Sequence, residues 1–80
     1  MKTTVRCTII LPDNYARVQR LYDHRTWFTL EEEIITDINR LTWLIEGMNS
    51  KGGKIIDNHQ FIDDDDLKEK TCIVYEYITG

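Results

Sequence analysis

The sequence predicts an α+β domain in which an antiparallel sheet of three or four strands carries one long amphipathic helix on one face. Two patterns support this prediction: residues 3–11 alternate in the manner of a half-buried strand, and residues 30–49 repeat apolar side chains at helical spacing. The chain has 80 residues, of which 30% are charged. That length and composition are typical of one globular domain, so we expect a single unit over residues 1–80.

The first strand should end at Pro12, because proline cannot donate a hydrogen bond to a strand ladder. Residues 15–24 then allow two interpretations. Tyr15, Val18 and Tyr22 have helical spacing, which favours a second short helix near 14–23. As a strand, the same segment would form a hairpin with residues 3–11.

The strongest expectation is a helix over about residues 30–49. Thr29 and Glu32 have the spacing of a capping box, in which each side chain satisfies a free backbone N–H at the start of a helix. Gly52 and Gly53 follow, as they do where helices end. The apolar side chains of this segment would form one stripe that packs on the sheet, comprising Leu30, Ile34, Ile38, Leu41, Ile45 and Met48.

Two further strands are predicted over residues 54–62 and 71–78. The second of these is apolar on both sides, with Cys72, Val74 and Ile78 alternating with Ile73, Tyr75 and Tyr77. Because a strand between two others is buried on both sides more often than an edge strand, we expect residues 71–78 to occupy a central position in the sheet.

The sequence contains none of the common motifs of hydrolases, nucleotide-binding loops or zinc proteases. Its two histidines, His24 and His59, are expected at the surface. Cys7 and Cys72 lack a second ligand at metal-binding spacing, so we expect two buried thiols. From the sequence we therefore expect a protein that is not an enzyme and that has no cofactor and no metal site.

The charges are distributed unevenly along the chain. Residues 1–29 contain five Lys or Arg and two Asp, whereas residues 30–80 contain five Lys or Arg and twelve Asp or Glu. The run Asp63, Asp64, Asp65 and Asp66 lacks the glycine and glutamate of a calcium-binding EF-hand loop. We interpret it as an exposed strand connection or as a contact for a basic partner, together with Glu32 and Glu46 on the polar side of the helix.

Trp43 is the most informative single residue, because on the expected helix it points away from the apolar stripe. Either residues 15–22 cover it, or it anchors an interface with another protein or a second copy of the chain. Small acidic domains without catalytic groups recur among phage-encoded inhibitors of host enzymes and among antitoxins. The favoured function is therefore a protein-binding module that inhibits or regulates a partner protein by blocking a site on it.

The alternative function is nucleic-acid binding. Residues 17–27 interleave basic and aromatic side chains, which neutralise phosphates and stack on bases, with the candidate residues Arg17, Arg20, Tyr22, Arg25 and Trp27. Because nucleic acids are negatively charged, the net charge of −4 makes nucleic-acid binding less favoured than protein binding. No stretch reaches the roughly 18 apolar residues of a membrane span, and residues 1–6 lack the apolar core of a signal peptide, so we expect a cytoplasmic protein.

Overall fold

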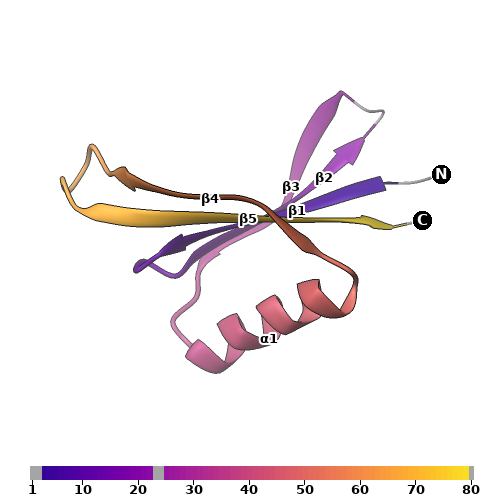
Figure 1. Cartoon of the computed structure of the whole chain (residues 1–80), viewed down its shortest axis with the longest axis horizontal. Helices are drawn as coiled ribbons and strands as arrows, with labels where there is room; N and C mark the ends of the chain where they lie inside the picture. Colours follow the sequence, from indigo (N-terminus) through magenta and orange to yellow (C-terminus); the bar gives the residue numbers. More distant parts are fainter. Residues whose placement is uncertain (1–2, 23–24, 80) are drawn as a thin grey trace.

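The computed structural model describes residues 3–22 and 25–79. It contains a five-stranded antiparallel sheet in the order β3-β2-β1-β5-β4 and one helix that lies against one face of that sheet (Figure 1). The elements along the chain are β1 (Thr3–Leu11), β2 (Tyr15–Tyr22), β3 (Thr26–Ile34), α1 (Ile38–Ser50), β4 (Lys54–Ile62) and β5 (Glu69–Thr79). The α+β character is confirmed. The predicted sheet of three or four strands with one long helix packed on it is wrong, because strands dominate the chain and the helix is short.

The centre of the sheet is formed by the two chain ends. β1 pairs with β5 from Thr3 opposite Thr79 to Leu11 opposite Thr71, and it pairs with β2 on its other side. β5 lies between β1 and β4, which confirms the central position predicted from its apolar side chains.

The segment 15–22 is a strand, so the preferred short helix near 14–23 is wrong and the hairpin alternative is right. β2 pairs with β1 from Tyr15 opposite Ile10 to Arg20 opposite Val5. The turn between them needs a left-handed residue, which Asn14 supplies with a φ of 59°. A turn this short brings residues 15–22 directly beside β1, where they gain ladder hydrogen bonds that a helix would forgo.

The expected helix over residues 30–49 begins eight residues later than predicted, because residues 26–34 pair with β2 as strand β3. Thr29 and Glu32 therefore lie in a strand and form no capping box. The N-cap is Asp37, whose carboxylate accepts a hydrogen bond from the backbone N–H of Asn39 at 2.9 Å. The helix ends at Ser50, and Gly52 follows it as expected, with a φ of 80°.

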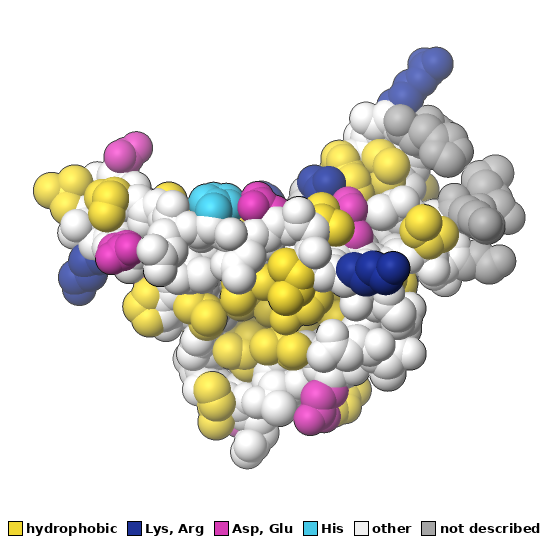
Figure 2. Space-filling model, in the orientation of Figure 1, with side chains coloured by type: hydrophobic (Ala, Val, Ile, Leu, Met, Phe, Trp, Pro, Cys, Tyr) yellow, Lys and Arg dark blue, Asp and Glu magenta, His cyan; other side chains and the backbone are white. Residues whose placement is uncertain are grey.

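The core lies between α1 and one face of the sheet, called here the covered face. Its buried residues are Cys7, Ile9, Ala16, Ile35, Leu41 and Met48. Of the predicted stripe, only Leu41, Ile45 and Met48 contribute to this core, whereas Ile38 is 64% exposed and Leu30 and Ile34 belong to β3. A 13-residue helix cannot cover five strands, and apolar side chains remain visible between helix and sheet (Figure 2).

The opposite face of the sheet, called here the open face, has no described element packed on it (Figure 1). Within residues 3–22 and 25–79 there is no helix with the length and apolarity needed to cross a bilayer.

Candidate functional site

Trp43 lies on α1 with 74% of its surface exposed. The interpretation in which residues 15–22 cover it is wrong, because these residues form β2 and leave most of the Trp43 side chain exposed. Among the described residues, no segment shields the indole from solvent. An exposed tryptophan at the edge of a packed helix is available for contact with another molecule.

The indole borders a cleft between α1 and the β2–β3 part of the sheet. The larger part of this cleft, with a volume of about 460 Å³, is lined mainly by apolar side chains that include Val18, Leu30, Leu44 and Met48. A smaller hollow of about 80 Å³ continues it toward Ile35. Val18, Glu31, Trp43 and Leu44 line both parts, so the two form one continuous cleft beside the indole.

A bulge in β3 helps to shape this cleft. Val18 pairs with Glu31 and the next residue of β2, Gln19, pairs with Thr29, so Leu30 is an extra residue in β3. Bulges bend a strand and increase its twist. The β2–β3 hairpin accordingly runs away from the helix toward its tip (Figure 1), which leaves Leu30 47% exposed.

The charged groups of the cleft are arranged in order along it. At the narrow end, Arg40 donates a hydrogen bond of 3.0 Å to the Glu33 carboxylate. At the other end, the ammonium of Lys51 lies 5.4 Å from the ring centroid of Tyr77. Glu31 lies between them, and within the described part of the chain no cation approaches its carboxylate within 4.0 Å.

The Glu31 carboxylate affects the pKa of a core residue, Cys7. Burial of the Cys7 thiol, with the Glu31 carboxylate as second cause, raises the pKa of Cys7 to about 11. Cys7 is therefore a neutral apolar core residue at physiological pH, as predicted.

The other predicted acidic contacts do not gather around Trp43. Glu32 lies in β3 on the open face, opposite Arg17 in β2. There it interacts with Tyr15, whose pKa is raised first by burial and then by the Glu32 carboxylate. Glu46 is exposed on α1. Glu32 and Trp43 were expected on one helix, and they lie instead in different elements because the helix begins only at Ile38.

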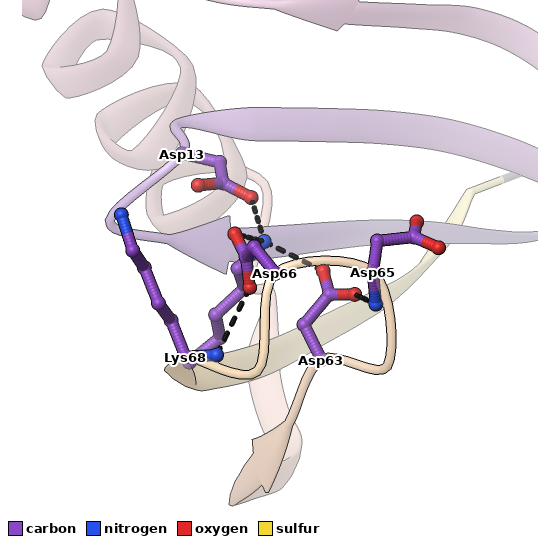
Figure 3. Close-up of polar contacts among 6 residues, drawn as sticks. Asp13, Asp63, Asp65, Asp66 and Lys68 are labelled. Carbon is purple, nitrogen blue, oxygen red and sulfur yellow. Dashed lines mark hydrogen bonds and ion pairs between the residues drawn. The ribbon is translucent and has the colours of Figure 1, made fainter.

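Two of the four consecutive aspartates form ion pairs with a lysine of the same chain (Figure 3). The ammonium of Lys70, with its side chain 7% exposed, lies 2.7 Å from Asp13, 2.6 Å from Asp63 and 3.1 Å from Asp66. The hydrogen bond from Lys70 is the main cause of a lowered pKa at Asp63. At Asp66, the backbone N–H of Lys68 is the main cause and Lys70 the second.

The aspartate run is thus a structured loop with a cation at its centre, and it is not simply a solvated connection. The Asp65 N–H donates to the Asp63 carboxylate at 2.8 Å, and the carboxylate of Asp65 points away from Asp13 and Asp66 (Figure 3). Asp64 and Asp65 remain exposed and available to a basic partner. Sequence reasoning missed Lys70; the signal was a lysine just before the largely apolar segment 72–75.

The five residues of the nucleic-acid alternative divide between the two faces of the sheet. Arg20 lies opposite the buried Val5 and so belongs with Tyr22 to the covered face, whereas Arg17 and Trp27 lie on the open face. Arg25 is exposed beyond β2. These residues therefore do not form one continuous surface.

On the open face, Trp27 contacts Arg6, an arginine that is not one of those five residues. The Arg6 guanidinium lies 4.1 Å from the ring centroid of Trp27 and 3.1 Å from the Glu76 carboxylate. Both its charge and its flat face are thus already engaged within the chain.

The remaining reactive groups also lie on the open face. His59 contacts the Asp57 carboxylate at 3.1 Å, and Cys72 faces His59 across the β4–β5 pair. Cys72 is a free, half-buried thiol, less buried than predicted, and its pKa is raised first by burial and then by Asp57. Within the described residues, no cluster of three or more His, Cys, Asp or Glu side chains could hold a metal ion. His24 lies outside those residues.

No known protein family matches the chain, and neither a curated protein nor a solved structure matches it. The candidate site therefore rests on the geometry of the cleft beside Trp43.

Proposed function

We propose that this chain is a protein-binding module that acts by covering a site on a partner protein, as inhibitors and regulators do. The observation that carries the proposal is the 74% exposure of Trp43 at the edge of an apolar cleft. Tryptophan side chains supply a large share of the energy at protein interfaces, especially where they lie beside a pocket.

The energy available at Trp43 is large for one side chain. A tryptophan side chain buries roughly 150–250 Å². At about 25 cal/mol per Å², covering the 74% of Trp43 that is exposed would contribute about 3–5 kcal/mol. Phe28, which is 52% exposed, and Leu30 extend the apolar surface along β3. A patch of this kind is typical of a surface that another protein covers.

The chemistry of the open face supports binding rather than covalent catalysis. A cysteine nucleophile reacts as the thiolate, which requires a lowered pKa. The pKa of Cys72 is raised instead, because the thiol is partly buried and lies near the Asp57 carboxylate.

The test is capture of the partner from a lysate of the organism that encodes the chain, using the tagged wild-type protein, Trp43→Ala and Leu67→Ala. Leu67 is the matched control because it is 77% exposed but lies in the loop before β5, away from the cleft. We expect Trp43→Ala to weaken partner binding by at least about 100-fold, as a loss of about 3 kcal/mol implies. Leu67→Ala should bind as the wild type does.

Thermal unfolding of both variants distinguishes binding from folding. The exposure of both side chains predicts unfolding temperatures close to that of the wild type. A partner that Trp43→Ala retains in full, or a cooperative transition that this variant loses, would contradict the proposal. Nucleic acid recovered in place of a protein, and released by moderate salt, would favour the alternative function instead.

A further inference from the structure

We infer that the cleft recognises a positively charged side chain of the partner protein, seated between the Trp43 indole and the Glu31 carboxylate. This inference rests on the proposed function and adds the chemical nature of the group that is bound. It starts from the position of Glu31, which lines both parts of the cleft together with Trp43.

Among the residues that the structure describes, Glu31 is the acidic group of the cleft that forms no ion pair. Glu33 also lines the cleft, but its carboxylate is paired with Arg40 of α1. Glu31 has no cation within 4.0 Å in the described ranges. In the unbound protein, water can hydrate the Glu31 carboxylate, because the side chain is exposed.

A partner that covers the cleft removes that water. An ionised carboxylate that loses its hydration without gaining a cation or hydrogen-bond donors is strongly destabilised. An entirely apolar segment would therefore bind poorly beside Glu31, although Val18, Leu30 and Leu44 offer it contacts. An arginine or lysine side chain suits both the apolar lining and the carboxylate. Its carbon stem packs on the apolar groups, and its charged end reaches the Glu31 carboxylate.

The aromatic ring of Trp43 adds to the same preference. A cation over the face of an indole is attracted by the ring, most strongly for tryptophan. The far end of the cleft already shows such an arrangement, with Lys51 over the Tyr77 ring. Because Lys51 repels a second cation there, the vacant position for a cation is at the Glu31 end.

A pair of short peptides tests this inference on the full chain. One is an acetylated and amidated leucine-rich pentapeptide with a central arginine. The other has citrulline in that position, which replaces the guanidinium by a neutral group of nearly the same size. Binding is followed by the shift of the indole N–H signal of Trp43 in the NMR spectrum, assigned by its absence in Trp43→Ala.

We expect the arginine peptide to bind at least fivefold more tightly than the citrulline peptide. Glu31→Gln should abolish this difference, because the amide keeps the shape of the side chain and removes its charge. Glu32→Gln is the matched control, since Glu32 is the neighbouring residue of the same strand but lies on the open face. It should retain the full preference for arginine.

Equal affinity for the two peptides would overturn the inference, and so would no shift of the indole signal with either peptide at millimolar concentration. An unchanged preference in Glu31→Gln would also overturn it. These outcomes are distinct from failure of the proposed function. A captured partner that depends on Trp43 but binds Glu31→Gln and the wild type equally would leave the function standing and remove only the charge recognition.

Discussion

Leu41 and Ile38 provide a decisive comparison, because both were expected in one apolar stripe and the structure separates them. Leu41 is 5% exposed in the core, whereas Ile38 is 64% exposed at the start of α1. Replacing a buried leucine by alanine costs about 2–5 kcal/mol through lost burial and the cavity that remains. An 80-residue domain has a total stability of only roughly 4–12 kcal/mol, so Leu41→Ala should remove a large fraction of it.

Ile38→Ala deletes a side chain of the same size from the same helix and should cost below about 1 kcal/mol, because most of that side chain is already in water. The assay is urea unfolding followed by circular dichroism, with the midpoint and slope compared among the two variants and the wild type. We expect Leu41→Ala to unfold at a much lower urea concentration and Ile38→Ala close to the wild type. Equal destabilisation by the two substitutions would refute the placement of the helix.

Two further predictions concern the ionisable groups. The pKa values of Asp63 and Asp66 are lowered from 3.8 in the folded protein, so their contribution to stability is present above about pH 4 and is lost as pH falls through the lower, folded values. The raised pKa of Lys70 has the opposite sign, with a contribution present below 10.5 and lost only at higher pH. Lys70→Met should therefore lower stability at pH 7 and flatten the loss of stability as pH falls below about 4, as measured by urea unfolding at each pH. An unchanged acid profile would contradict the cluster. In thiol labelling read by mass spectrometry, Cys72 should react slowly in the native protein and Cys7 only after unfolding, and labelling of Cys7 before Cys72 would show that the strand assignment is wrong.

The strands with a strong local pattern were predicted almost residue by residue. β1 and β4 match the expected ranges 3–11 and 54–62, and β5 extends the expected range 71–78 by two residues at its start and one at its end. Their β-branched and aromatic residues and their bounding turn residues are local properties of the sequence.

Residues 15–22 and 30–34 were assigned wrongly, because the helical pattern was favoured in both segments. Leu30 and the three glutamates that follow it are good helix formers on their own. What decides their conformation is pairing with neighbouring strands, which the side-chain pattern of a single segment does not show. The exposure of Trp43 was foreseen as one of two options, whereas the position of Glu32 was wrong because it depended on the extended helix.

The Lys70 cluster was invisible for a related reason. Asp13 lies in the turn after β1 and Lys70 lies near the start of β5, so the two are far apart in sequence. They meet because β1 and β5 are antiparallel neighbours, with Leu11 opposite Thr71. Only the strand order shows that the aspartate run and the first turn share one end of the sheet.

The edges of the sheet indicate how a partner can bind. The two edge strands are β3 and β4, and each is interrupted by a bulge, at Leu30 in β3 and at Ile56 in β4. β3 also carries three consecutive glutamates. Bulges and charges on edge strands are the features by which sheets resist the addition of a further strand.

A partner is therefore expected to bind this chain through side chains rather than by extending the sheet. Trp43 is the most exposed aromatic residue among those described, and it borders the apolar cleft in which Glu31 has no cation. A bulge at Leu30 thus has two consequences. It disrupts the β3 edge as a template for strand pairing, and it places Leu30 and Glu31 beside the helix where a side chain from another protein can enter.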